Sequence, residues 1–335
     1  MRSRVLSSIV LLLLALAAPS AIQAQTPDLT GTVIVLNKNA NTADLIDLAT
    51  GERVAQLPTG ANPHELIATR DGRTAVGTDY SANSLTVFDI QTATVRRRID
   101  LGQYDSPHGI VFLPGDTLVA VTSENQGAVM IVDIHAGTVD QVIPTSARGS
   151  HMVAATADGA TLWTADMRSN TVTELSREHG TVVRALPAPM TPEAINVTRS
   201  GSMVFAGSNG TGRVTIFDTE TGATETLGEG FGWPYRMFLT PTEDRLIVPD
   251  LENEELRFFD LESRTEIGSI AFTGEGPQGL VMYGDGRHLF LSLSRANRIA
   301  VVNTETLRVV GYLPSGAGPD GIAWSPLTVR PAGDL

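Results

Sequence analysis

A short motif recurs seven times along this chain at nearly constant spacing, and this repeat constrains the fold more than any other feature. Successive copies begin 42 to 44 residues apart. Self-similarity with a period in this range is typical of propellers and solenoids. The copies begin at Pro63-His64, Pro107-His108, Ser150-His151, Pro192-Glu193, Pro234-Tyr235, Pro277-Gln278 and Pro319-Asp320.

The unit that spans residues 277–318 shows the local pattern most clearly. Four short runs that are typical of strands alternate with turns in this unit, at residues 279–283, 288–293, 298–302 and 308–313. Four strands in each repeat, with no helical pattern, favour a propeller over a helical solenoid. We therefore predict an all-β fold, a seven-bladed β-propeller of four-stranded antiparallel blades.

The strand ends of this unit resemble those of a known repeat family. The matching motifs are Val302-Asn303-Thr304, Leu313-Pro314-Ser315-Gly316 and Pro319-Asp320-Gly321-Ile322. Over roughly residues 29–326 the chain is similar to the YVTN-type β-propeller repeat family, which includes YncE-like exported seven-bladed propellers. No Trp-Asp dipeptide occurs in the sequence, which argues against the WD40 variety. The resemblance implies the fold and leaves the function open, because such repeats serve as binding surfaces, scaffolds and, in some relatives, cofactor or metal sites.

The two ends of the chain are predicted to complete one blade together. Residues 33–58 contain only three strands, which match the second, third and fourth strands of the repeat. The missing first strand follows the last full unit, at residues 321–324. Closure of this kind removes an open sheet edge that would otherwise template aggregation. We expect a single propeller domain over residues 29–326 and an untethered tail over residues 327–335.

Residues 1–24 are typical of a secretory signal peptide. Arg2 and Arg4 precede an apolar run at residues 9–18, and small residues lead to a predicted cleavage site after Ala24. The apolar run is too short to span a membrane, and no second segment of spanning length follows it. We therefore expect a periplasmic or secreted monomer without a membrane span after cleavage.

Charge and cysteine content exclude several classes of function. Removal of residues 1–24, whose only charges are Arg2 and Arg4, changes the net charge from −13 to −15. An anionic surface of this size repels phosphate backbones, so nucleic acid is not an expected partner. The chain has no cysteine, which excludes disulfides and thiolate metal sites. The sequence also lacks a P-loop, a dinucleotide fingerprint, a nucleophile elbow and an H-E-x-x-H motif.

Short polar residues recur at the end of every third strand, and we interpret them as turn formers. A carboxylate or amide at such a position accepts hydrogen bonds from the backbone of the following turn. These residues are Asp47, Asp89, Asp133, Ser176, Asp218, Asp260 and Asn303. The same interpretation applies to the histidines in or beside turns, which are His135, His179 and His288.

Residues that carry chemistry are expected to differ between blades and to converge on one mouth of the central channel. His64, His108 and His151 occupy equivalent positions in three consecutive blades. They are interpreted either as ligands of one divalent metal ion or as structural and ligand-contacting residues. In the first case Glu193 of the next blade would be a fourth ligand or a catalytic general base. Carboxylates at the ends of second strands would hold the imidazoles in one tautomer or contact a ligand, namely Asp79, Glu124 and Asp166.

The opposite side of the mouth has a different character, with the segment 231–236 carrying Trp233, Tyr235 and Arg236. This group is suited to stack on and pair with an anionic or sugar-like ligand, or else to pack as a bulky loop between blades. Two functions therefore stay open. The first is an exported propeller that binds a small molecule or an exported partner protein at the mouth. The second is a metal-dependent lyase, hydrolase or oxidoreductase that uses the three histidines.

Overall fold

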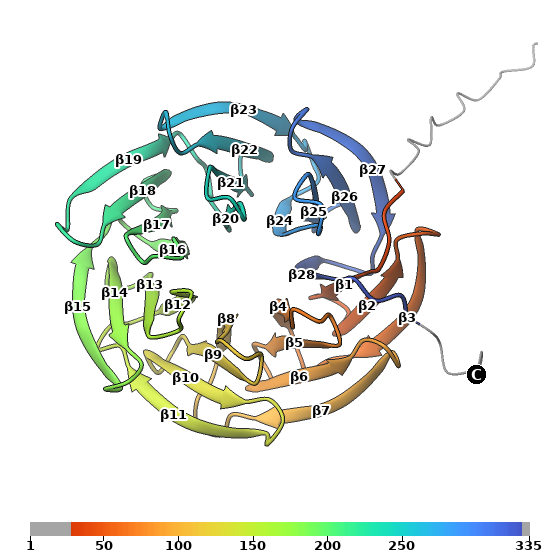
Figure 1. Cartoon of the computed structure of the whole chain (residues 1–335), viewed down its shortest axis with the longest axis horizontal. Coiled ribbons are helices and arrows are strands. Elements are labelled where there is room, and N and C mark those ends of the chain that lie inside the picture. Colours follow the sequence, from red (N-terminus) through yellow and green to blue (C-terminus); the bar gives the residue numbers. More distant parts are fainter. Residues whose placement is uncertain (1–27, 330–335) are drawn as a thin grey trace, which may run out of the picture.

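The computed structural model describes residues 28–329, which form a closed ring of seven four-stranded sheets around a central channel (Figure 1). The predicted all-β, seven-bladed propeller is confirmed. Within residues 28–329 no helix is long and apolar enough to cross a membrane. The predicted signal peptide, residues 1–24, lies outside the described residues.

The two ends of the chain share one blade, as predicted. In Figure 1 the blue strand β28 lies beside the red strand β1. These strands pair antiparallel, with Ile34 opposite Ala323 and Val33 opposite Trp324. From the channel outward the blade consists of β28 (Pro319–Ser325), β1 (Thr32–Asn37), β2 (Thr42–Asp47) and β3 (Glu52–Pro58).

In each of the other six blades the strands follow chain order from the channel outward (Figure 1). The first two of these blades consist of β4 (Pro63–Ala68), β5 (Thr74–Asp79), β6 (Ser84–Asp89) and β7 (Thr94–Asp100), then β8 (Pro107–Phe112), β9 (Leu118–Ser123), β10 (Ala128–Asp133) and β11 (Thr138–Pro144). The next two consist of β12 (Ser150–Ala155), β13 (Thr161–Asp166), β14 (Thr171–Ser176) and β15 (Thr181–Pro187), then β16 (Pro192–Val197), β17 (Met203–Ser208), β18 (Arg213–Asp218) and β19 (Thr224–Glu229). The last two consist of β20 (Phe238–Leu239), β21 (Arg245–Asp250), β22 (Glu255–Asp260) and β23 (Thr265–Ala271), then β24 (Pro277–Met282), β25 (His288–Leu293), β26 (Arg298–Asn303) and β27 (Arg308–Pro314).

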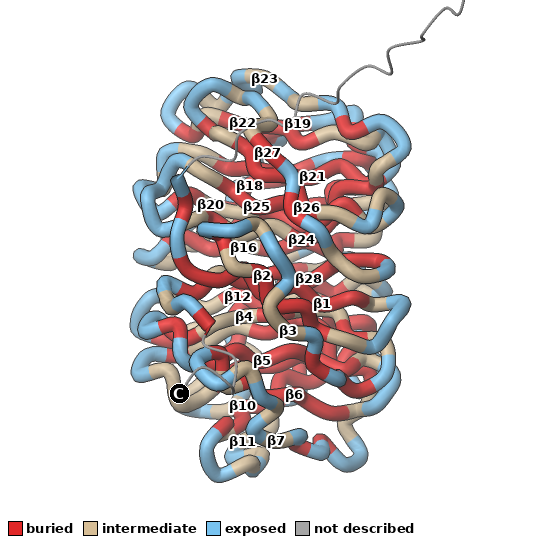
Figure 2. The backbone as a smooth tube through the Cα atoms, turned by 90° about the vertical axis from the view of Figure 1, so that its right-hand side faces the viewer, coloured by how far each residue is buried: buried red, intermediate tan, exposed pale blue. Residues whose placement is uncertain are grey.

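The hydrophobic core lies between neighbouring blades. Every residue of β1 and β5 is buried, whereas the outer strand β7 alternates between exposed and partly buried residues over most of its length. Figure 2 shows the resulting pattern, with buried segments inside and exposed loops at the two faces and the rim. One core cluster joins Val87 of β6 to Val121 of β9 across two blades. Middle strands therefore need continuous apolar runs, because both of their faces pack against other blades.

The recurring polar residues after the third strands act as turn formers, as predicted. Asp133 shows the geometry, since its Oδ1 accepts hydrogen bonds from the N–H groups of His135 at 2.7 Å and Ala136 at 2.8 Å. Asp218, Asp260 and Asn303 accept equivalent bonds in their own turns. These carboxylates and amides therefore stabilise hairpins rather than a functional site.

The chain stays packed beyond the predicted end of the domain. The Leu327 carbonyl accepts a hydrogen bond of 2.7 Å from the Thr32 hydroxyl. Val329 is buried in the cluster that joins the closing blade to the first full blade. The expected untethered tail therefore does not begin at residue 327, because residues 327–329 cover apolar surface at the closure.

The fifth full blade departs from the regular pattern at its inner strand. Pro234 forms only an isolated bridge with Asp250, and β20 is limited to Phe238–Leu239. Pro249 of the neighbouring strand β21 has no N–H group, so the ladder is interrupted between these two contacts. Residues 235–237 lie outside the assigned strands at the mouth of the channel, although the Tyr235 N–H donates to the Pro249 carbonyl at 3.0 Å.

Candidate functional site

The mouth of the channel contains a cavity of about 270 Å³. Two groups predicted from the sequence line it from different blades. They are the histidine row, His64, His108 and His151, and the aromatic arc, Trp233 and Tyr235. The remaining lining residues are Lys38, Glu124, Met167, Glu193, Leu251 and Gln278.

The histidine row consists of three imidazoles in contact. Each is the second residue of an inner strand, in β4, β8 and β12. The ring centroids of His64 and His108 are 4.8 Å apart, and those of His108 and His151 are 3.7 Å apart. Gly109 permits this close approach of inner strands, because a Cβ there would lie 2.6 Å from the Cα of Met152. Equivalent repeat positions therefore do bring the three rings together.

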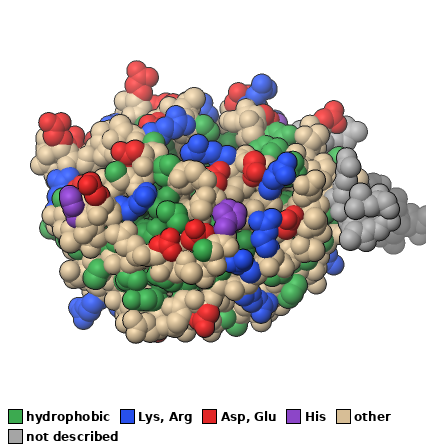
Figure 3. Space-filling view, turned by 60° about the horizontal axis from the view of Figure 1, so that its bottom comes forward, with side chains coloured by type: hydrophobic (Ala, Val, Ile, Leu, Met, Phe, Trp, Pro, Cys, Tyr) green, Lys and Arg blue, Asp and Glu red, His purple; other side chains and the backbone are tan. Residues whose placement is uncertain are grey.

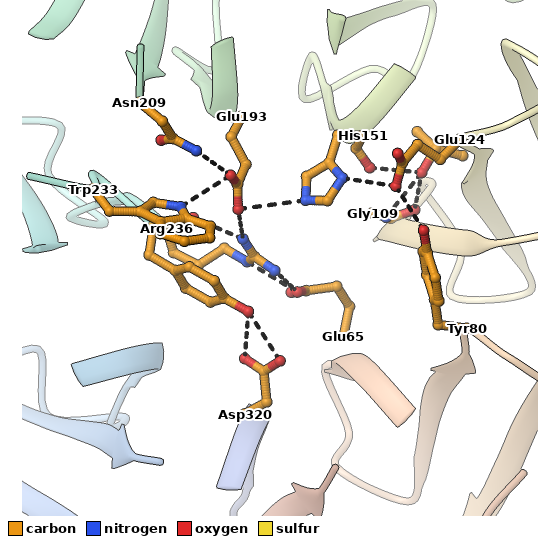
Figure 4. Close-up of polar contacts among 12 residues, drawn as sticks. Glu65, Tyr80, Gly109, Glu124, His151, Glu193, Asn209, Trp233, Arg236 and Asp320 are labelled. Carbon is orange, nitrogen blue, oxygen red and sulfur yellow. Dashed lines mark hydrogen bonds and ion pairs between the residues drawn. The ribbon is translucent and has the colours of Figure 1, made fainter. Parts of the chain in front are cut away.

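His151 lies between two carboxylates (Figure 4). Its Nδ1 is 3.1 Å from Oε2 of Glu124, and its Nε2 is 3.5 Å from Oε1 of Glu193. Burial lowers the pKa of His151, but the two carboxylates outweigh burial, so the pKa is raised and the imidazolium form is favoured. Burial in turn raises the pKa of Glu124, but His151, Arg168 and Tyr80 together lower it to about 2.

His64 and His108 are neutral near pH 7, because their pKa values are lowered, whereas the pKa of His151 is raised. Burial is the main cause that lowers the pKa of His64 to about 4. Its Nδ1 is 2.9 Å from the Asn62 carbonyl, so Nδ1 carries the proton and Nε2 is an acceptor. Burial, followed by the positive charges of His151 and Arg236, holds the pKa of His108 well below its ordinary value.

The ring nitrogens of the histidine row differ in their partners. Within residues 28–329, no group of three or more His, Asp or Glu side chains is arranged to hold a metal ion. Both ring nitrogens of His151 face carboxylates, at Glu124 and Glu193. His64 and His108 remain as neutral imidazoles, which is the form that metals bind.

Glu193, the predicted general base, is the centre of a polar network (Figure 4). It is 2% exposed and accepts hydrogen bonds from Trp233 Nε1 at 2.9 Å and from the Asn209 amide. Burial alone would raise the pKa of Glu193, but His151 and Arg236 lower it by a larger amount. The pKa is therefore below its ordinary value, and the carboxylate stays ionised. Because these four partners engage it, Glu193 orients its neighbours in this structure.

Arg236 is not free to meet a ligand, in contrast to the expectation from the sequence. It is 5% exposed, and its Nε donates to Oε1 of Glu65 at 2.9 Å. Its Nη1 donates to the Tyr235 carbonyl at 2.7 Å and lies 3.4 Å from Oε1 of Glu193. The guanidinium also stacks 4.1 Å from the Tyr235 ring centroid. The positive charge of Arg236 is therefore paired with the carboxylates of Glu65 and Glu193.

Lys38, which was not among the site residues predicted from the sequence, lies directly after β1 in the turn to β2. Its Nζ is 2.8 Å from Oδ2 of Asp320, and the Tyr235 hydroxyl is 3.1 Å from the same oxygen. A signal was available, because Lys38 is the only lysine among the 24 basic residues of the chain.

Two of the predicted carboxylates, Asp79 and Asp166, do not reach the histidine row. Both are fully buried. Asp79 accepts hydrogen bonds from the Gly60 N–H and from the hydroxyls of Ser84 and Thr86. Asp166 accepts from the hydroxyls of Ser150, Thr164, Thr171 and Thr173. These bonds pin strand ends and loops, so only Glu124 of the three contacts a mouth histidine.

The surface shown in Figure 3 carries acidic and basic side chains interspersed with hydrophobic ones. The charges on this face are not gathered into a patch of one sign. The net charge of −13 therefore does not by itself mark a docking surface on this side of the molecule.

Comparison with known proteins supports the fold and the family resemblance. Residues 17–117 match the model of a family described as YNCE-like beta-propeller. A solved structure with a similar fold is Kuenenia stuttgartiensis hydrazine synthase, with a TM-score of 0.73 and 20% sequence identity over 87% of this chain and 99% of that chain. At this identity the likeness concerns the fold alone. No curated protein matches the sequence.

Proposed function

We propose that this YNCE-like β-propeller is an exported protein that binds a small molecule in the mouth of its channel. The observation that supports this proposal is the cavity of about 270 Å³ between the histidine row and the aromatic arc. Its volume is close to the lower limit of ligand pockets, about 300 Å³. Such pockets combine apolar walls with a few fixed polar groups, and this lining has both.

Burial favours a small molecule over a partner protein. His108 is 2% exposed and His151 is 8% exposed, so the surface of another protein would not reach them. Trp233 of the aromatic arc is also held in position before a ligand binds, because its Nε1 donates a hydrogen bond to Glu193. A fixed site loses little conformational entropy when it binds, which favours affinity for a small ligand.

The test uses ligand-observed NMR with a library of small aromatic and aliphatic fragments. Trp233→Ala is expected to weaken fragment binding about tenfold, since a stacked aromatic contact contributes about 1 kcal/mol or more. The far-UV spectrum should not change, because Trp233 lies outside the strands. Tyr312→Ala, on an exposed outer strand, is the matched control. Equal binding by both variants would contradict the proposal.

A second proposal is a divalent metal ion held by the histidine row in a lyase, hydrolase or oxidoreductase. The ring contacts of 4.8 and 3.7 Å and the neutral state of His64 and His108 support it. When bound, such an ion would supply Lewis-acid chemistry or an activated water.

Metal analysis of untagged protein tests this second proposal. A single His→Ala change at His64, His108 or His151 should remove most of the metal. The same change at His135 or His179, which are exposed turn residues, should not. Protein without stoichiometric metal would overturn the proposal.

A further inference from the structure

We infer that the ligand of the mouth carries a carboxylate or a comparable small oxyanion, which Lys38 and His108 bind. This inference rests on the proposed function, because it names the chemical class of the ligand at the same site. Arg236 is the basic residue that the sequence suggested for binding an anionic ligand, but it is already paired with Glu65 and Glu193.

Lys38 has hydrogen-bonding capacity to spare. Its side chain is 20% exposed and lines the cavity. An ammonium group has three donors. One is directed at Oδ2 of Asp320, at 2.8 Å, and a second is 3.5 Å from the Tyr235 hydroxyl, which is at the limit of a hydrogen bond. At least one N–H of the Lys38 ammonium group therefore remains to donate to a ligand.

His108 is a buried polar side chain without a partner. It is 2% exposed, and its Nδ1 makes no hydrogen bond to any of the described residues. No hydrogen bond involves its Nε2 within residues 28–329 either, although the ring lines the cavity. A neutral imidazole always carries one N–H donor. Buried polar groups in folded proteins are normally paired, so an unpaired one at a cavity indicates a ligand group that completes it.

The charges around His108 favour an anion. The groups that lower the pKa of His108 by their charge include His151, Arg236 and Lys38. His151 and Arg236 are paired with carboxylates, so Lys38, which keeps an unused N–H, is the cation that can meet an anion. The two carboxylates of the lining do not offset this for a ligand. Glu124 is paired with Arg168 and His151, and Glu193 lies between His151 and Arg236. A ligand ammonium would find no unpaired carboxylate here.

The rest of the lining indicates an apolar body attached to the anionic group. Trp233, Met167 and Leu251 provide an aromatic and an aliphatic wall in the same cavity. The best match is therefore a small aromatic or unsaturated monocarboxylate, with its charge toward Lys38 and its body against Trp233.

Three probes of the same shape and different charge test the ligand class. Benzoate, benzyl alcohol and benzylamine are titrated by calorimetry into the full mature chain. We expect benzoate to bind at least tenfold more tightly than either of the other two. Tighter binding of benzylamine or benzyl alcohol would overturn the inference while leaving a ligand site at the mouth. Failure of all three probes to bind would count against both the inference and the proposed function.

Substitution of Lys38 needs a background in which its partner is neutral. Lys38→Met alone would leave Asp320 buried and unpaired, which destabilises the fold. The comparison is therefore between Asp320→Asn and the double variant Lys38→Met/Asp320→Asn. Loss of a charge-assisted bond should weaken benzoate binding by roughly ten- to a hundredfold and leave benzyl alcohol unchanged. Equal affinity of the two variants for benzoate would overturn the role of Lys38.

The single lysine provides a second readout that does not depend on a variant. Acylation with an amine reagent can modify only Lys38 and the terminal amine, because the chain has no other lysine. We expect benzoate to slow acylation of Lys38 at least fivefold, and benzyl alcohol to have no such effect. The rate at the terminal amine is the internal reference. Unchanged acylation of Lys38 at saturating benzoate would place the anion elsewhere and overturn the inference.

Discussion

Arg236 reaches across the mouth of the channel to Glu65, a residue 171 positions earlier in the chain, with its Nε 2.9 Å from Oε1 (Figure 4). The side chains of this pair are only 6% and 14% exposed. The guanidinium also contacts Glu193, so one cation pairs with a buried carboxylate, Glu193, and a partly buried one, Glu65, from different blades. The Arg236–Glu65 pair thus joins β4 to the segment before β20 beside the cavity.

Replacement of Arg236 should therefore reduce stability. Arg236→Met removes the cation and leaves the buried Glu193 and the partly buried Glu65 without it, which we expect to cost about 3–5 kcal/mol in the free energy of unfolding. Urea denaturation measures the difference. The matched control is Arg295→Met, since Arg295 is 45% exposed and pairs at the surface with Glu254. That change should cost about 1 kcal/mol or less. Similar losses in both variants would contradict the structural role of Arg236.

Acid should destabilise the protein through the neutral histidines. The pKa of His64 is about 4 in the folded chain and 6.5 ordinarily, so the unfolded chain binds more protons between these values. Stability therefore falls as the pH drops from 6.5 to 4, by on the order of 3 kcal/mol for this group. His108 acts in the same direction, because its pKa is also lowered.

Other groups at the mouth shape the rest of the pH profile. His151 has a raised pKa, so its contribution to the free energy of unfolding is complete below pH 6.5. This contribution is lost as the pH rises through the pKa of His151 in the folded chain. Glu124 contributes above pH 4.5, and this contribution is lost as the pH falls from 4.5 to 2. Urea unfolding of the wild type and of His64→Gln between pH 4 and 8 tests the assignment. The variant should have the shallower dependence between pH 4 and 6.5, and identical slopes would refute it.

Removal of the closing strand should also destabilise the fold. Deletion of residues 320–335 takes away nearly all of β28, the inner partner of β1, and with it the Asp320 partner of Lys38. We expect a soluble protein with a much lower melting temperature, or an aggregating one, because an edge strand is exposed. Deletion of residues 330–335 is the control and removes none of the described contacts. If the variant that lacks residues 320–335 melted like the wild type, closure of the ring by β28 would not contribute to stability.

Export predicts a defined mature end. N-terminal sequencing of the protein recovered from outside the cytoplasm should begin at Gln25, after cleavage behind Ala24. The measured mass should then lack residues 1–24. A start at Met1 would refute the signal peptide.

The fold was predictable because the evidence for it is local and repeated. Strand lengths, turn residues and the period each appear in every unit, and the incomplete unit at 33–58 points to its complement at 321–324. The contact of His64, His108 and His151 followed from the same symmetry. The pairing of Arg236 with Glu65 did not, because it joins two blades that are not neighbours, and the repeat pattern does not indicate which positions meet across the channel. Lys38 was not predictable from the repeat, because it lies one residue beyond the end of β1, in a turn whose sequence differs between blades.

Filling the cavity tests directly whether the mouth is the ligand site. Met167→Trp introduces a bulky side chain into the lining of the mouth, and Thr242→Trp introduces the same side chain at an exposed loop that does not line it. Ligand-observed NMR with the fragment library and with benzoate compares both variants with the wild type. We predict that binding is lost in Met167→Trp and kept in Thr242→Trp. Undiminished binding in Met167→Trp would contradict the claim that the mouth is the ligand site.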